Sequence, residues 1–383
     1  MRIIVGMSGG VDSAVAALLL KRQGYDAVGV FMKNWDETGE DGQCTASADW
    51  DDVRRVCDHI GIPYYSVNFA QEYYERVFAY CLREFEAGRT PNPDVLCNRE
   101  IKFKSFMEFA RGVGVERIAT GHFVRTDNEG RLIKGIDPNK DQSYFLYMLK
   151  KEQLLKSLFP VGGMTKSEVR EIARREGLPV AEKKDSTGIC FIGERRFKPF
   201  LMKYFKAECG DIVTVSGEVV GKHDGLMYYT IGQRRGLGIG GQCSGDAGRW
   251  FVLEKDMARN RLIVGQAADD WRLYSHGAIL SGVTWVSGEP PALSFECTAK
   301  FRYRQADQRV TVDARGDTAV VRCDAPQRAL TPGQSAVLYD GEVCLGGGVI
   351  HRALPSVPKL VHHFQAFEYF EDDGTYLRMA DNT

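Results

Sequence analysis

The chain has 383 residues, which is too long for one ordinary domain and predicts two or three. Its 44% hydrophobic content is enough for a core in each, and its formal net charge of -1 excludes nucleic-acid binding through overall charge, so such a partner would need local basic patches. Met1 runs almost directly into a buried strand, and no apolar run approaches the ~20 residues of a membrane span. We therefore expect a cytosolic protein with no membrane contact, whose ten cysteines are mostly free thiols.

The first half of the sequence alternates between strand and helix patterns. Buried-strand patterns such as RIIVGM are followed by helical patterns that end at glycine, as at Gly24 and Gly61. The spacing of Thr165 and Glu168 predicts a capping box at the start of a later helix. Regular alternation of this kind predicts an α/β fold with a parallel sheet covered on both faces. The predicted strands are 2–7, 26–32, 62–69 and 116–122, and the predicted helices are 11–23, 49–60, 70–86, 99–111 and 167–177.

The sequence changes character after about residue 208. Helical periods end, and short β-branched runs such as DIVTVSGEVVG alternate with turn signals. This pattern predicts mostly-β modules, most simply small barrels, and a break near 267–275 divides them into two. We therefore expect an α/β catalytic domain, a small central β domain, a C-terminal β-barrel and an unassigned tail, at 1–208, 209–272, 273–355 and 356–383 respectively.

A glycine-rich segment, GMSGGVDS, joins the first predicted strand to the first predicted helix. Glycines let the backbone approach a ligand closely, and the unpaired N–H groups at a helix N-terminus suit a phosphate. The segment ends in Asp-Ser and lacks the lysine of a Walker loop. A plain strand–turn–helix is the simpler alternative. The six residues SGGVDS, however, resemble the S-G-G-x-D-S signature of PP-loop ATP pyrophosphatases, which split ATP between the α and β phosphates.

Two cysteines lie in unusual surroundings. Cys97 ends the segment TPNPDVLC, whose prolines predict a rigid loop and whose polar residues speak against a buried structural cysteine. Cys190 lies in KKDSTGICFIG, where nearby cations would lower the pKa of its thiol. Composition alone favours a buried position for Cys190, because Ile189, Phe191 and Ile192 could form a short core strand. The residues by themselves leave both interpretations open.

Six motifs in the same order resemble the bacterial tRNA-specific 2-thiouridylase family, from Met1 to about His351. They are GMSGGVDS, NPDVLCN, TGH, KDQSYFL, DSTGICFIG and YTIGQRRGLG. Enzymes of this family replace the O2 oxygen of the wobble uridine in certain tRNAs with sulfur. The resemblance implies ATP as co-substrate, Mg²⁺, tRNA, and a sulfur-donor protein, either a cysteine desulfurase or a persulfide relay carrier. No metal site within the protein is implied.

The resemblance also implies roles for individual residues. Cys190 would carry a persulfide, Cys97 would be its partner thiol, and Asp94 would act as acid or base beside the flipped-out uridine. The residues implied at ATP are Gly6, Met7, Ser8, Gly9, Gly10, Val11, Asp12, Ser13, Met32 and Gly121. Those implied at the target base are Asn92, Pro93 and Asp94, and those implied elsewhere on the tRNA are His122, Lys140, Asp141, Gln142, Arg302, Tyr303 and Gln334.

Local basic clusters exist despite the neutral total, and solvated surface is the simpler explanation for any one of them. The run FRYR at 301–304 is more specific, because on the expected strand it would offer both a phosphate contact and a stacking ring. Two alternatives remain: another PP-loop ATPase, and a nucleotide-sensing or RNA-binding module without turnover. Iron–sulfur thiolases are disfavoured because the sequence has no C-x-x-C pair. Release of AMP that depends on tRNA would separate an enzyme from a sensor.

Overall fold

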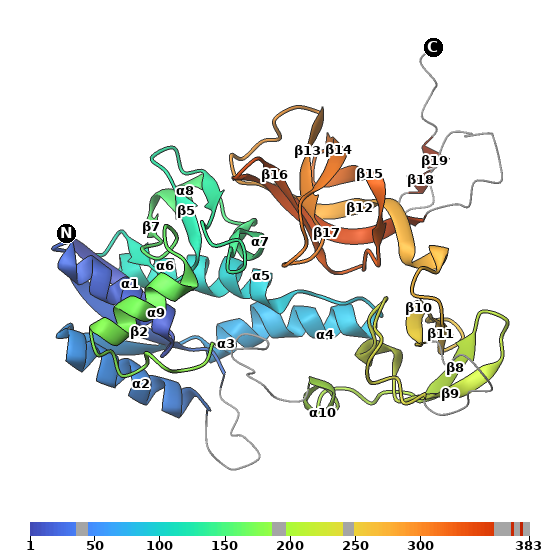
Figure 1. Cartoon of the computed structure of the whole chain (residues 1–383), viewed down its shortest axis with the longest axis horizontal. Coiled ribbons are helices and arrows are strands. Elements are labelled where there is room, and N and C mark those ends of the chain that lie inside the picture. The colour runs from blue at the N-terminus through green and yellow to red at the C-terminus, as the bar shows by residue number, and fades with distance from the viewer. Residues whose placement is uncertain (36–44, 186–196, 240–248, 356–368, 371–375, 378–383) are drawn as a thin grey trace.

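The computed structural model describes residues 1–35, 45–185, 197–239, 249–355, 369–370 and 376–377. Cys190 and most of the predicted tail therefore lie outside the described residues. Figure 1 shows an α/β region at one end, with two separate β regions at the other. Among the described helices, none has the length and apolar character that a membrane crossing requires.

The N-terminal region is built on a five-stranded parallel sheet with the order β3-β2-β1-β4-β7. Successive side chains of a strand point to opposite faces, so Ile3 and Val5 pack into one core and Ile4 into another. Helices α1, α2 and α9 supply the first core, and α3 to α6 supply the second. The predicted parallel sheet with two covered faces is thus confirmed. The strands are β1 (Arg2–Met7), β2 (Asp26–Lys33), β3 (Tyr64–Asn68), β4 (Ile118–Ala119) and β7 (Ser157–Leu158).

Four of the five predicted helices lie at or near their predicted positions, two helical runs contain π-helical turns, and the short helices α7 and α8 were not predicted. The predicted capping box is present, because the Thr165 N–H donates to Glu168 Oε2 at 2.6 Å and the Glu168 N–H donates to Thr165 Oγ1 at 3.3 Å. The helical segments are α1 (Val11–Arg22), α2 (Thr45–Ile60), α3 (Ala70–Tyr73), η1 (Tyr74–Phe78), α4 (Ala79–Glu86), α5 (Pro93–Cys97), η2 (Asn98–Ser105), α6 (Phe106–Gly112), α7 (Ser143–Leu146), α8 (Lys151–Leu155) and α9 (Lys166–Arg175).

One helix boundary was predicted wrongly. The segment before residue 99 was expected to be a loop, but helix α5 already begins at Pro93 and continues through η2 into α6. Proline is well suited to the first position of a helix, where its missing N–H has no intrahelical role. Asn92 caps this helix, because its Oδ1 accepts a hydrogen bond from the Val95 N–H at 3.4 Å.

Two all-β regions follow, as predicted. The first is a four-stranded sheet with the order β10-β11-β8-β9, in which β11 and β8 are parallel. The second is a six-stranded antiparallel barrel with the order β12-β15-β14-β13-β16-β17, closed by pairing of β12 with β17. The elements are α10 (Phe197–Leu201), β8 (Gly210–Thr214), β9 (Val219–His223), η3 (Leu226–Tyr228), β10 (Phe251–Asp256), β11 (Arg261–Gly265), η4 (Trp271–Leu273), β12 (Tyr274–Trp285), β13 (Ser294–Lys300), β14 (Gln308–Arg315), β15 (Thr318–Arg328), β16 (Ser335–Asp340) and β17 (Val343–Pro355). A separate two-stranded sheet follows, made of β18 (Tyr369–Phe370) and β19 (Tyr376–Leu377).

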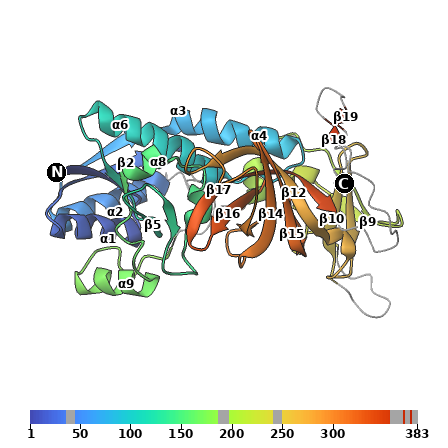
Figure 2. The same cartoon turned by 90° about the horizontal axis from the view of Figure 1, so that it is seen from above.

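The N-terminal region and the barrel share a sheet. A hairpin of β5 (Val124–Thr126) and β6 (Leu132–Lys134) extends from the α/β region and pairs with β17, with Ile133 opposite Val343. Helix α4 runs alongside the barrel toward the central sheet, as Figures 1 and 2 both show. The hairpin was not predicted, because its two three-residue strands are too short to give a pattern.

Candidate functional site

The segment Gly6–Ser13 forms a compact turn between β1 and α1. Gly9 has φ +74°, a conformation that favours glycine, and a side chain there would also meet the Asp49 backbone at 2.7 Å. The Ser8 N–H donates to Ser13 Oγ at 3.2 Å, and the Ser13 hydroxyl donates to the Gly10 carbonyl at 3.1 Å. No side chain caps α1 at Gly10. The loop is therefore held by its own serines, in the arrangement that suits a phosphate at a helix N-terminus.

Two residues distant in sequence contact this loop. A Cβ atom on Gly121 would lie 2.6 Å from the Ser13 nitrogen, so only glycine fits between β4 and the start of α1. A Cβ atom on Gly6 would lie 3.1 Å from Met32 Cε, which places the Met32 side chain next to the first residue of the loop. The structure thus brings together the residues predicted at ATP. Their contact with ATP stays a prediction.

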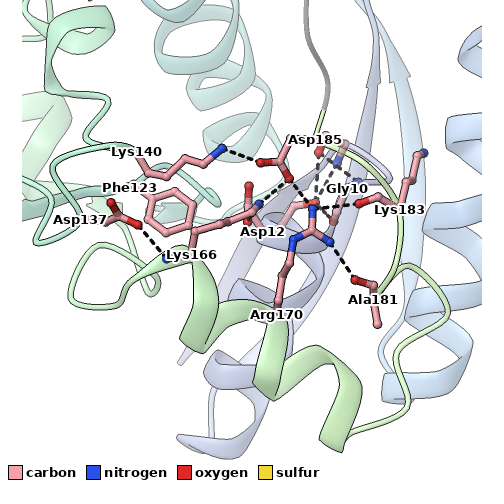
Figure 3. Close-up of polar contacts among 12 residues, drawn as sticks. Gly10, Asp12, Phe123, Asp137, Lys140, Lys166, Arg170, Ala181, Lys183 and Asp185 are labelled. Carbon is pink, nitrogen blue, oxygen red and sulfur yellow. Dashed lines mark hydrogen bonds and ion pairs between the residues drawn. The ribbon is translucent and has the colours of Figure 1, made fainter. Parts of the chain in front are cut away.

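A network of charged side chains borders the loop (Figure 3). Lys166, the first residue of α9, places its Nζ 2.5 Å from Asp12 Oδ1 and 2.8 Å from Asp185 Oδ1. Lys140 Nζ lies 2.5 Å from Asp185 Oδ2, and Arg170 lies 2.8 Å from Asp185 Oδ1. Three cations therefore meet two carboxylates beside the glycine-rich loop. Such a cluster can exchange carboxylate partners for phosphate oxygens.

The two carboxylates of this network titrate differently. Burial raises the pKa of Asp12 and outweighs the opposing effect of Lys166. Burial acts in the same direction on Asp185, but hydrogen bonds from Lys140 and Lys166 prevail and lower its pKa to about 2. Sequence reasoning missed Lys166 and Arg170. The capping box gave the only signal, because it places residue 166 at the N-terminus of a helix.

Two of the three predicted catalytic residues, Asp94 and Cys97, lie on α5. A spacing of three residues places the two side chains on neighbouring positions of one helix face. Cys97 is fully buried, with no exposed surface, so the expectation drawn from its polar neighbours was wrong. The reason is the helix itself, which turns Val95, Leu96 and Cys97 into the core while polar residues flank them in sequence.

Five other cysteines are free thiols whose pKa is raised to about 12, chiefly by burial. A thiol with such a pKa stays protonated and is a poor nucleophile. Cys209, also a free thiol, is exposed instead. All five thiols, of which Cys297 is only partly buried, are therefore poorly suited to sulfur transfer. They are Cys57, Cys81, Cys297, Cys323 and Cys344.

The predicted tRNA contacts near residue 140 are engaged within the protein. His122 is buried, its Nδ1 lies 2.7 Å from Thr120 Oγ1, and burial lowers the pKa of its imidazole well below 6.5. Asp141 accepts hydrogen bonds from the Gly135 N–H at 3.0 Å and the Ser143 hydroxyl at 2.9 Å. His122 is consequently neutral at physiological pH and cannot attract a phosphate by charge.

Two more of these residues have partners inside the chain. Gln142 Oε1 accepts a hydrogen bond from the Phe123 N–H at 2.9 Å, and Lys140 is held by Asp185. These contacts hold the loop that positions Lys140 in the charged network. A tRNA contact by these residues stays a prediction.

Two of the three barrel residues predicted to contact tRNA, Tyr303 and Gln334, contact the α/β region. Arg302 and Tyr303 were expected on a strand, but they lie in the turn after β13, because the run of paired residues ends at Lys300. The Tyr303 ring centroid lies 4.5 Å from that of Phe145 on α7. Arg302 is exposed and donates to the Ala329 carbonyl at 3.0 Å.

Gln334 of the barrel forms hydrogen bonds to the α/β region. Its Nε2 donates to the carbonyls of Thr90 and Pro91, at 2.8 and 3.3 Å. The neighbouring Gly333 has φ +91°, and a Cβ atom on it would lie 2.8 Å from the Thr90 nitrogen. The turn before β16 therefore contacts the segment that leads into α5 and Cys97.

Comparison with known proteins fits this architecture. Family models described as a tRNA methyl transferase HUP domain, a tRNA methyl transferase PRC-barrel domain and an aminomethyltransferase beta-barrel domain match residues 1–194, 198–266 and 275–350. The tRNA-specific 2-thiouridylase MnmA of Alkaliphilus oremlandii is 58% identical over 92% of this chain and 98% of its own length. The chain belongs to the tRNA-specific 2-thiouridylase (MnmA) family.

Other comparisons agree with the family assignment or add little to it. The MnmA protein of Streptococcus sanguinis is also 58% identical, over 92% of this chain and 96% of its own length. Among solved structures, a 4-thiouridine synthetase–RNA complex with bound ATP shares 17% identity, covers 53% of this chain and 49% of its own, and has a TM-score of 0.33. A similarity that low carries no argument about function. The MnmA relatives match nearly the whole chain, so the assignment depends on them.

Proposed function

We propose that this protein catalyses the ATP-dependent replacement of the O2 oxygen of the wobble uridine of tRNA with sulfur. The observation that carries the proposal is the 58% identity to MnmA proteins over 92% of the chain. The assembled loop of Gly6–Ser13, with Gly121 and Met32 against it, supports the use of ATP. The finer steps given below are part of the same proposal.

The first step activates the uridine. Its O2 attacks the α-phosphorus of ATP, pyrophosphate leaves, and the oxygen becomes part of an AMP leaving group. The helix N-terminus behind the loop would stabilise the charge on the transferred phosphoryl group. The amino groups of Lys166 and Lys140 lie where they could hold the departing pyrophosphate. They would release their carboxylate partners for phosphate oxygens.

Mg²⁺ fits the donor groups that border this loop. Mg²⁺ in nucleotide sites is held by one or two carboxylates together with phosphate oxygens. Asp12 and Asp185 would supply those carboxylates beside the loop. The ion would screen the phosphate charge.

The second step transfers sulfur. A donor protein would first load Cys190 with a sulfane sulfur, whose terminal atom attacks C2 of the activated uridine and displaces AMP. Cys97 then attacks the Cys190 sulfur, the S–S bond breaks, and its electron pair remains on the sulfur now bound to C2. A Cys97–Cys190 disulfide is left, and an external thiol must reduce it by two electrons. Because Cys97 is buried, its thiol must become accessible before this step. Release of hydrosulfide from the persulfide is the alternative order.

A direct test of the proposal follows the modified nucleoside. The full chain is incubated with unmodified tRNA, ATP, Mg²⁺ and sulfide, or with a cysteine desulfurase and cysteine. We expect mass spectrometry of the digested tRNA to show 2-thiouridine, with AMP formed only when tRNA is present. Consumption of ATP without thiouridine would contradict thiolation, and ATP binding without AMP would indicate a nucleotide sensor.

A further prediction concerns Arg302. If this exposed side chain contacts a phosphate, Arg302→Ala will weaken tRNA binding and reduce the log–log salt slope of the affinity by about one. Arg309→Ala, on β14 of the same barrel and also exposed, is the matched control. Filter-binding titrations at several salt concentrations measure both variants, and thermal melts confirm that they are folded. An unchanged slope for Arg302→Ala would remove this residue from the tRNA interface.

A further inference from the structure

A cavity of about 450 Å³ lies between the α/β region and the central β region. One wall is the segment before α5, with Pro91 and Pro93. The opposite wall is the central β region, with Tyr228 and Thr230, and Lys198 of α10 borders the space between them. A volume of this size is within the range of small-molecule sites, roughly 300–1,000 Å³. The described lining includes neither Asp94, Cys97 nor any residue of the glycine-rich loop, but it includes Pro93, so this cavity adjoins the proposed target-base site without containing the catalytic residues.

The chemistry of the walls suits a nucleobase. Aromatic and apolar surfaces come from Phe85, Met227 and Tyr228. Lys198 Nζ lies 5.8 Å from the centre of the Tyr228 ring, and it pairs with Asp224 at the edge of the site. Proteins recognise unpaired RNA bases by stacking them on aromatic rings next to cations that contact the backbone. The walls therefore combine the two features that a single-stranded nucleotide needs.

One polar atom of the cavity lining lacks a partner. The Tyr228 hydroxyl oxygen is buried and has no hydrogen-bond partner in the described structure. Buried polar groups are nearly always hydrogen-bonded, so such an atom calls for an explanation. The hydroxyls of Thr90 and Thr230, 3.3 Å apart, are also in residues that line the cavity. The hydroxyl itself has almost no exposed surface, so the side chain must turn toward the cavity before a ligand with hydrogen-bonding edges can satisfy it.

We propose that this cavity binds the nucleoside next to the target uridine in the tRNA loop. The inference rests on the proposed function, because it assumes a tRNA whose wobble base is held by Asn92–Asp94. Pro91 and Pro93 are adjacent in sequence to those residues, so one segment would present its two sides to two consecutive nucleotides. Tyr228 would stack on the neighbouring base or hydrogen-bond to its edge, and Lys198 would face its phosphate. The cavity would then help to splay the loop and so expose the uridine.

A double-mutant cycle tests this assignment. RNA hairpins carry the target uridine with an intact loop, or with an abasic residue on its 5′ or its 3′ side. Their affinities for the wild-type chain and for Tyr228→Ala are measured by fluorescence anisotropy without ATP. We expect one abasic position to weaken binding to the wild type by about 10-fold, as for one lost stacking contact. Tyr228→Ala should bind the intact and that abasic RNA equally.

Two further variants make the result specific. Tyr228→Phe keeps the ring and removes the hydroxyl, so it should retain most of the abasic penalty even if Tyr228→Ala folds poorly. Tyr65→Ala, at a tyrosine on β3 that is 61% exposed, should leave the whole cycle unchanged. If wild type and both Tyr228 variants show the same abasic penalty at each position, the assignment is overturned. Because binding is measured without turnover, that failure is distinct from a failure to form thiouridine.

Discussion

A Cys97→Ser chain will form no 2-thiouridine, although it will still release pyrophosphate in the presence of tRNA. A serine hydroxyl cannot attack a disulfide sulfur, so the sulfane sulfur should remain on Cys190, as the persulfide or as an adduct with the tRNA. Cys190→Ser should fail one step earlier, because it cannot accept sulfur from the donor. Intact-mass spectrometry of the protein after incubation with donor, ATP and tRNA distinguishes these species.

The control for both variants is Cys209→Ser. Cys209 is an exposed free thiol in the segment before β8, so the variant tests whether removal of any accessible thiol lowers activity. We expect its thiouridine yield to equal that of the wild type. Wild-type yield from either Cys97→Ser or Cys190→Ser with a protein donor would contradict the proposed pair.

Gly121→Ala should lower the rate of tRNA-dependent pyrophosphate release by about 100-fold or more, since displacements of about 1 Å at a catalytic centre have effects of that size. The added methyl group would lie 2.6 Å from the Ser13 nitrogen and 2.7 Å from the Asp12 carbonyl carbon. Both neighbours are backbone, so the loop itself must move. Pyrophosphate release and ATP affinity should fall together, because the same loop is proposed to bind and to activate ATP.

Gly112→Ala is the matched control for this substitution. Gly112 ends α6, and a Cβ atom there would have no neighbour within 4 Å. This variant should keep wild-type activity and a similar melting temperature. If Gly121→Ala retains ATP-dependent activity while folded, the loop of Gly6–Ser13 does not hold the nucleotide in the proposed way.

The parts of the fold with strong local patterns could be predicted from the sequence. β1 and α1 have long apolar runs and a glycine-rich junction, and Thr165 and Glu168 have the spacing of a capping box. In such segments the local preference and the tertiary packing agree. The assembly of Gly121 against Ser13 could be expected only through the family resemblance, because nothing in the TGH sequence shows which strand lies beside the loop.

Other parts depend on tertiary contacts that the sequence does not reveal. The prolines around Pro93 are typical of a loop, but proline equally starts a helix, and only the structure distinguishes the two. The burial of Cys97 follows from that helix. The pairing of Lys166 with Asp12 joins the start of α9 to the start of α1 across a long stretch of chain. The turn at Arg302 and Tyr303 ends a strand early, in a run of residues that favours strands.

The hairpin that pairs with β17 has a consequence for how the chain is made. β6 leaves the ribosome long before Val343 and Cys344, the residues that complete its ladder. At translation rates of about 5–20 residues per second, its open edge waits on the order of tens of seconds for a partner. During that time the N-terminal region presents an unpaired strand to other nascent chains, and such edges are sites of aggregation. The barrel is therefore synthesised long after the hairpin whose open edge it covers.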